Sequence, residues 1–161
     1  MRARVLSSLI LTPLLLASCS DRALNPAPSG DVDIDIPRTQ GETRVRVAPH
    51  GEAPATFRSG PQVPVLLPEG ITAYPGGRIV ENTVVERGRA QHMLLVTETP
   101  DPVAQVTAFY REQLRRARIA PSLDIGTERH AGLGGALPAG GELVIAIREE
   151  NGSTRIEISV S

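Results

Sequence analysis

A single segment of the chain, residues 101–118, has the pattern of an amphipathic helix, whereas the apolar segments around it alternate like strands. Asp101 suits the N-cap, Pro102 suits the first helical position, and Pro121 ends the segment. At about 3.6 residues per turn, its apolar side chains share one stripe: Val103, Val106, Tyr110, Leu114 and Ala117. One helix with one apolar stripe must bury that stripe against a sheet.

The strand-like segments give the order of elements around this helix. They are, in chain order, residues 79–86, 92–98, 123–129, 142–148 and 154–161. Asn151 and Gly152 carry the turn signal of a hairpin between the last two segments. Residues 132–141 are rich in glycine and predict a mobile hairpin loop. The order β-β-α-β-β-β predicts an α+β fold, with one helix packed across an antiparallel sheet of about five strands.

Composition separates a flexible tether from a folded domain. Gly 15 and Pro 14 among 161 residues exceed average usage, which indicates turns and a linker. Residues 19–63 carry repeated proline and glycine breaks and predict a tether, and residues 64–161 predict the α+β domain. Within the tether, segments 31–36 and 43–47 alternate strictly and predict a β-hairpin over 31–47. An isolated hairpin is marginally stable, so this one needs a surface to dock on.

The N-terminus has the features of a secretion signal. Arg2 and Arg4 make it positive, and residues 5–17 are apolar but fall short of the roughly 20 residues that span a bilayer. Pro13 also interrupts this run. Residues 1–18 are therefore predicted to be a signal peptide, and we expect no transmembrane helix in the mature protein.

The sequence Leu16-Ala17-Ser18-Cys19 closes this signal and contains the single cysteine of the chain. It resembles the lipobox of bacterial lipoproteins, which implies that Cys19 is acylated and begins the mature chain. Several acyl chains anchor a protein stably in a membrane. In Gram-negative lipoproteins an aspartate directly after the cysteine favours the inner membrane; Ser20 stands here, which implies outer-membrane sorting. An ordinary signal peptide with an incidental cysteine is the alternative.

The folded domain carries a second resemblance. It rests on Tyr74-Pro75-Gly76-Gly77, on the sequence TETPDP at 97–102, and on the helix positions Val103, Phe109, Tyr110 and Leu114. This pattern is similar to a small domain of uncharacterised proteobacterial envelope proteins, which are often lipoproteins. The resemblance implies an envelope location. It implies no catalytic residues, because that family has no established activity.

Charge restricts the partners of the chain. A net charge of −1 argues against a nucleic-acid-binding domain, which usually carries a basic excess. All 17 basic residues are arginines, and Arg111, Arg115 and Arg118 line one flank of the predicted helix. They are the candidate contact with an anion or a partner. Glu112 is placed to pair with Arg116 at i,i+4.

Several interpretations of Arg111, Arg115 and Arg118 remain open. The side chains form a solvated helix face, or they bind an external anion such as a lipopolysaccharide phosphate or a peptidoglycan carboxylate. Like charges on one flank destabilise a helix slightly, so a counter-charge inside the chain is a third interpretation. The acids of the tether that would supply it are Asp31, Asp33 and Asp35.

A calcium site is an alternative use of the acidic residues in the tether. Four of them match carboxylate positions of a calcium-loop pattern: Asp31, Asp33, Asp35 and Glu42. Ile36 replaces the glycine of that pattern, and neither flank predicts a helix. Strand alternation explains these acids better, so we expect no metal.

No other pattern predicts a catalytic or cofactor site. His50, His92 and His130 lie far apart in the sequence and lack the spacing of zinc ligands. The glycines of 132–135 lack the lysine of a phosphate-binding loop. Serine-hydrolase motifs are absent from the sequence, and no pair of carboxylates stands out. We therefore expect no cofactor.

Together these features predict a lipid-anchored outer-membrane protein that faces the periplasm and is not an enzyme. It would act as a binding or assembly accessory of the cell envelope. Its partners would be the membrane, through Cys19, and an envelope protein or an anionic envelope polymer. The alternative is a small periplasmic hydrolase with an unrecognised active site, which needs a cleft of converging acids or histidines. A structural interaction protein with an exposed sheet face or edge is a further alternative.

Overall fold

The computed structural model describes residues 31–35, 41–48, 51 and 53–161. Three predictions lie outside the described residues: the signal peptide over 1–18, the lipobox with Cys19, and the position of His50. The described part of the expected tether begins at β1 (Asp31–Asp35).

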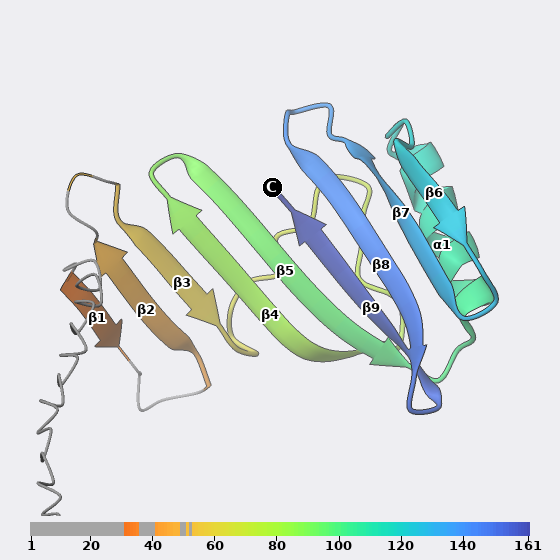
Figure 1. Ribbon diagram of the computed structural model, residues 1–161, viewed down its shortest axis with the longest axis horizontal. Coiled ribbons are helices and arrows are strands. Elements are labelled where there is room, and N and C mark those ends of the chain that lie inside the picture. Colours follow the sequence, from red (N-terminus) through yellow and green to blue (C-terminus); the bar gives the residue numbers. More distant parts are fainter. Residues whose placement is uncertain (1–30, 36–40, 49–50, 52) are drawn as a thin grey trace, which may run out of the picture.

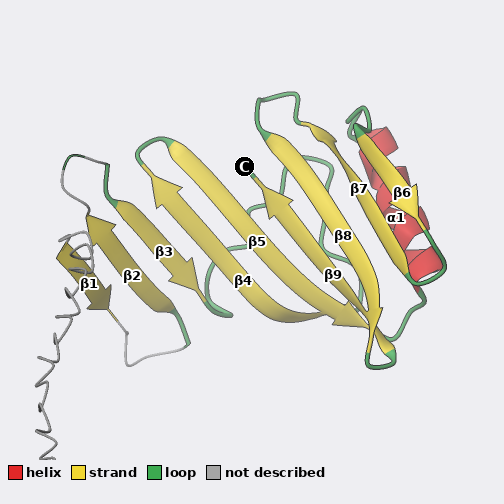
Figure 2. Cartoon of the chain, in the orientation of Figure 1, coloured by secondary structure: helices red, strands yellow, loops and turns green. Residues whose placement is uncertain are grey.

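Nine strands of the described chain form one antiparallel sheet, and one helix packs on it (Figure 1). The further strands are β2 (Thr43–Ala48), β3 (Ala55–Ser59), β4 (Arg78–Arg87), β5 (Ala90–Thr99), β6 (Leu123–Gly126), β7 (His130–Ala136), β8 (Glu142–Glu150) and β9 (Ser153–Val160). Their order across the sheet is β1-β2-β3-β4-β5-β9-β8-β7-β6. The helix α1 (Val103–Arg116) contacts β7 and β8, so it covers one end of one face of the sheet (Figure 2).

The predicted α+β fold with about five strands is therefore wrong. The described chain is mostly a nine-stranded antiparallel sheet with one helix. The predicted strand segments are present as β4, β5, β6, β8 and β9. β1 and β2 match the two segments predicted as a β-hairpin within the tether. The strands that were not predicted are β3, in the expected tether, and β7, in the glycine-rich segment.

The strands of the expected tether extend the sheet. β1 pairs with β2, which places Asp33 opposite Arg46. β3 pairs with β2 on one side and β4 on the other, so Phe57 stands opposite both Val45 and Val85. Pairing with β3, which itself pairs with β4, gives the hairpin of β1 and β2 the neighbouring strand that an isolated hairpin lacks.

The glycine-rich segment forms β7 because its glycines let neighbouring backbone approach closely. A Cβ on Gly135 would lie 2.3 Å from the carbonyl oxygen of Ala120. A Cβ on Gly134 would lie 2.5 Å from the carbonyl oxygen of Leu143. Leu133 is the only large apolar side chain of β7, so the sequence of this strand does not show alternating apolar and polar residues. The predicted mobile loop is wrong over residues 132–136.

The core lies between the helix stripe and one face of the sheet. Val106, Tyr110 and Leu114 of α1 are buried there. The sheet contributes buried aliphatic side chains, among them Leu95, Leu133, Leu143, Ile145, Ile147, Ile156 and Ile158. Each such side chain contributes about 1.5–3 kcal/mol when fully buried. This packing holds α1 against the sheet.

The start of α1 differs from its prediction. The N-cap is Pro102, with no side-chain cap bond, so the prediction of Asp101 as the cap is wrong. The carboxylate of Asp101 instead accepts hydrogen bonds from the hydroxyl of Tyr74 at 2.7 Å and from the side-chain amide of Gln105 at 3.2 Å. These bonds tie the segment before β4 to the first turn of α1. No helix in the described part of the chain is long and apolar enough to cross a membrane.

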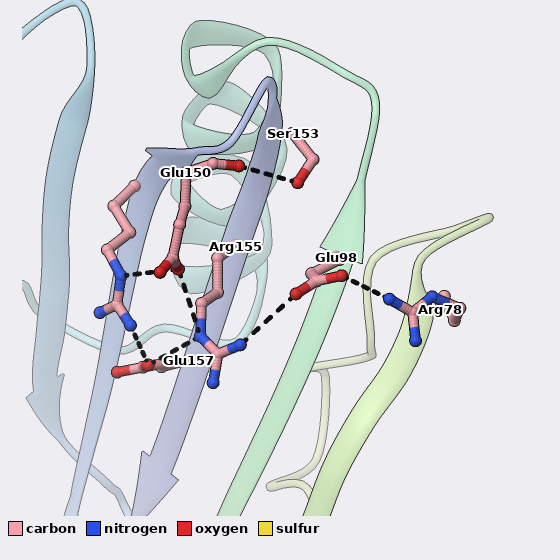
Figure 3. A network of polar contacts seen from close by, with 7 residues as sticks. Arg78, Glu98, Glu150, Ser153, Arg155 and Glu157 are labelled. Atoms are coloured by element: carbon pink, nitrogen blue, oxygen red, sulfur yellow. Dashed lines mark hydrogen bonds and ion pairs between the residues drawn. The ribbon is translucent and has the colours of Figure 1, made fainter.

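A ladder of alternating charges crosses the sheet (Figure 3). It runs from Arg78 on β4 through Glu98 on β5 to Arg155 and Glu157 on β9. Burial acts to raise the pKa of Glu157, but hydrogen bonds from Arg148 and Arg155 outweigh it and hold that pKa below its ordinary value. The buried residues Ile156 and Ile158 alternate with these charges, so the ladder lies on the face opposite the core.

Candidate functional site

The C-terminal end of α1 is closed by a Schellman motif with an unusual residue. The amide of Ile119 donates to the carbonyl of Leu114 at 3.0 Å, and the amide of Arg118 donates to the carbonyl of Arg115 at 3.2 Å. This pattern requires a left-handed residue after the cap, and Arg118 supplies it with φ of 56°. Glycine usually occupies this position, and any other residue costs about 1–2 kcal/mol there.

Two arginines of the predicted stripe, Arg111 and Arg115, are paired with acids of the domain itself. Arg111 makes a bidentate contact with Asp124 of β6, with Nη2 2.6 Å and Nε 3.2 Å from its two oxygens. Arg115 and Arg116 share Glu112, each at 2.7 Å. The hydrogen bonds from Arg115 and Arg116 lower the pKa of Glu112 to about 2. The predicted i,i+4 pair of Glu112 and Arg116 is thus confirmed.

Arg118 differs from the other arginines of the stripe. Its side chain is exposed, and within the described residues its guanidinium has no ion pair or hydrogen bond. A guanidinium stays charged at any ordinary pH and offers several donors in a planar fork that fits a carboxylate or phosphate. Among the described residues the Arg118 guanidinium is therefore an unpaired cation, and the helix cap fixes the backbone position from which its side chain extends.

Two hollows meet at Arg118. The first, here the arginine groove, has a volume of about 430 Å³. Its lining includes Arg111, Arg115, Arg118, Leu114, Ile119 and Asp124. The second, here the leucine pocket, has a volume of about 760 Å³. Its lining includes Leu66, Leu67, Leu137, Val160, Ile119 and Arg118.

The leucine pocket opens where three parts of the chain converge. The segment 66–70, the end of α1 and the loop from β7 to β8 supply most of its walls. Its floor is continuous with the core, because Leu67, Ala117, Leu137 and Val160 pack against the core cluster. The polar groups of its lining are Glu69, Gln91, Arg116 and Arg118. A mainly apolar hollow with a few polar groups in its lining has the general form of a small-molecule site.

Of the interpretations left open for the arginine stripe, the pairing with the tether acids does not fit the fold. Asp31, Asp33 and Asp35 belong to β1, at the sheet edge opposite to β6, whereas α1 packs on β7 and β8 (Figure 1). Asp124 and Glu112 provide the counter-charges instead. Asp124 could not be identified from sequence spacing, because only the return of β6 along the helix brings it to Arg111.

The two histidines that the structure describes belong to the lining of neither hollow. His92 on β5 and His130 at the start of β7 are both exposed. His130 borders a shallow hollow whose lining includes Ile125, Thr127 and Arg148 and holds no carboxylate. Within the described residues, no group of three or more histidine, cysteine, aspartate or glutamate side chains is placed to hold a metal ion.

The geometry around Arg118 thus combines one cation without a partner among the described residues, two arginines paired with acids, and an adjoining hollow that is mainly apolar. No protein-family model, no curated protein and no solved structure matches this chain.

Proposed function

We propose that the chain is a non-enzymatic binding module of the cell envelope, anchored by lipid on Cys19 and held at the periplasmic face of the outer membrane. The anchor is supported by the lipobox Leu16-Ala17-Ser18-Cys19 and the apolar signal before it. The module binds an anionic group of an envelope ligand at Arg118.

The observation that carries the binding role is the state of Arg118. Its backbone is left-handed at a position where glycine is more stable, and its guanidinium is unpaired within the described residues. Strain of this kind is found at functional sites, where the side chain is needed for more than the fold. A cation that no acid of the domain neutralises is available to an external anion.

The acids of the two hollows favour binding over hydrolysis. The carboxylate of Asp124 is held by both Nε and Nη2 of Arg111, and this contact lowers its pKa. A carboxylate in that state is a poor general base or acid near neutral pH. Glu69 belongs to the lining of the leucine pocket, where no histidine accompanies it.

The anchor is tested by fractionating envelopes that contain the native chain or a Cys19→Ala variant. The proposal predicts that the native chain sediments with outer membranes and has an intact mass that begins at Cys19 and includes acyl chains. The variant is expected to lose that mass. A soluble native chain without acyl chains would refute the anchor.

Anion binding is tested by titrating inorganic phosphate into the full chain, reconstituted in neutral phosphatidylcholine nanodiscs. The nuclear magnetic resonance signals of the arginine Nε–H groups report each guanidinium separately. The proposal predicts a saturable shift at Arg118 and none at Arg111, which Asp124 already occupies. The same small shift at every arginine would refute a site at Arg118.

A further inference from the structure

We infer that the ligand of this site is a single-chain amphiphile with an anionic head, whose head binds Arg118 while its acyl chain fills the leucine pocket. The inference rests on the proposed function, because it names the chemical class of the ligand that Arg118 binds. The inference adds an apolar part to the ligand, which the arginine groove alone does not imply.

The size and lining of the leucine pocket suit an acyl chain. Its volume of about 760 Å³ lies within the range of about 300–1,000 Å³ typical of small-molecule sites. Most of its lining is aliphatic, with Leu66, Leu67, Leu137 and Val160 among the side chains. Each methylene buried on such a surface raises affinity about fourfold. A short alkyl chain therefore suffices to dominate binding.

The walls of the pocket are formed before a ligand enters. Gly70 approaches the helix end so closely that a Cβ there would lie 3.0 Å from the Cβ of Ala117. The side-chain amide of Gln113 donates to the hydroxyl of Thr72 at 2.7 Å, and its oxygen accepts from the Thr72 amide at 2.9 Å. The segment that carries Leu66 is thus fastened to α1 just beyond Gly70. Leu66 keeps 40% of its surface exposed, which leaves apolar area available to a ligand.

The charges in the lining favour one anionic head over an extended anionic polymer. Arg118 belongs to the lining of both hollows, so a head bound there adjoins the leucine pocket. Arg116 is already paired with Glu112 at 2.7 Å. Glu69 also belongs to the pocket lining and would repel a second negative group laid across it. One negative charge at Arg118, followed by an uncharged chain, complements this arrangement.

The test compares three probes on the full chain in neutral phosphatidylcholine nanodiscs: inorganic phosphate, dodecyl phosphate and dodecanol. Empty nanodiscs provide the correction for partition of the two alkyl probes into lipid. Binding is measured by isothermal titration calorimetry, which needs neither side chain, and in the native chain it is also followed at the Arg118 Nε–H signal and the methyl signals of Leu66. We expect dodecyl phosphate to bind at least about tenfold more tightly than inorganic phosphate, because burial of its chain adds to the contact at Arg118.

Three variants separate the two halves of the site. Arg118→Gly, which the helix cap tolerates, should weaken both phosphates by about tenfold, the loss expected for one charge-assisted hydrogen bond. Leu66→Asn should remove the gain from the alkyl chain and leave inorganic phosphate unchanged. Ala139→Asp changes an exposed position of the same lining and should have the same effect as Leu66→Asn. Ile79→Asn is the matched control, because Ile79 is 46% exposed and lies outside this lining.

Each remaining outcome has a distinct meaning. Phosphate binding at Arg118 with no gain from the alkyl chain would overturn the inference and leave the proposed function intact. If neither inorganic phosphate nor dodecyl phosphate binds, both the inference and the proposed function are overturned. Dodecanol binding as tightly as dodecyl phosphate, unaffected by Arg118→Gly, would overturn the anionic head and assign the pocket to a neutral ligand.

Discussion

The backbone amide of Ile119 donates to the carbonyl of Leu114 across the end of α1 at 3.0 Å. This bond closes the helix only because the residue between the cap and Ile119 turns into the left-handed region, and that residue is Arg118 with φ of 56°. The same turn places the one unpaired arginine of the stripe, within the described residues, between the arginine groove and the leucine pocket. Helix termination and the candidate site are thus the same local structure.

The backbone strain at Arg118 gives a stability prediction. Arg118→Gly should raise the free energy of unfolding by about 1 kcal/mol, because glycine adopts the left-handed conformation without steric cost. Arg118→Ala should give no such gain, since alanine keeps the strain while removing the charge. Denaturant unfolding of the full chain measures both. Equal stability of the glycine and alanine variants would show that strain at this residue is negligible.

The close approach of the chain after α1 to β7 gives a second prediction. Gly135→Ala should destabilise the fold by about 1–3 kcal/mol, because the new Cβ would lie 2.3 Å from the carbonyl oxygen of Ala120. Gly132→Ala in the same strand is the matched control. Its Cβ would lie 3.4 Å or more from the side chains of Ile125 and Leu123, which is ordinary contact. Comparable losses for the two variants would contradict the packing described for β7.

The raised pKa values of Tyr74 and Tyr110 predict that the fold loses stability in alkali. Burial, together with the hydrogen bond to Asp101 and its charge, raises the pKa of Tyr74 above 10.0. Burial likewise raises the pKa of Tyr110. A raised pKa means that the unfolded state releases its proton first, so stability is complete below pH 10 and declines as pH rises through the folded-state pKa values. Unfolding midpoints measured across this range check the decline.

Tyr74→Phe separates the contribution of Tyr74 from that of Tyr110. At neutral pH the variant should lose about 1.5–3 kcal/mol, because the hydroxyl donates to a carboxylate at 2.7 Å. Its alkaline decline should be shallower than that of the native chain, since only Tyr110 still titrates. An unchanged decline would show that Tyr74 does not contribute to it.

The lowered pKa of Glu157 predicts that the fold loses stability in acid. Its pKa is lowered by hydrogen bonds from Arg148 and Arg155, which outweigh the opposing effect of burial. A lowered pKa stabilises the fold above the ordinary value of 4.5, and this contribution is lost as pH falls through the folded-state pKa. Glu157→Gln should flatten that part of the decline, whereas Glu128→Gln, at an exposed position, should retain it. Acid unfolding curves of the two variants provide the comparison.

The elements with a strong periodic pattern were predictable from the sequence. The stripe of α1 is buried as expected at Val103, Val106, Tyr110 and Leu114. The hairpin between β8 and β9 turns at Asn151 and Gly152, as its turn signal predicts. These elements are specified by local residues, so one sequence suffices to find them.

The remaining strands depend on partners that the sequence does not reveal. β7 has glycines where a strand usually has apolar side chains. Glycine is needed there because the strand lies close to the backbone of Ala120 and Leu143. β3 becomes a strand because β4 offers it an open edge, with Phe57 opposite Val85. Both depend on tertiary contacts, which override local propensity.

The candidate site was only partly predictable for the same reason. The arginines of the stripe are visible at helical spacing, as is the pairing of Glu112 with Arg116. Nothing in the sequence distinguishes Arg118 from Arg111, because the difference arises when β6 brings Asp124 to Arg111. The leucine pocket joins segments far apart in sequence, so it too required the fold.

Native mass spectrometry of the full chain, extracted from its membrane in a non-ionic detergent, tests the central claim most directly. The account predicts that the native chain retains a bound anionic amphiphile of a single acyl chain, and that the folded Arg118→Gly variant retains much less of it. A native chain that carries no such molecule, or a variant that retains it equally, would contradict a site built around Arg118.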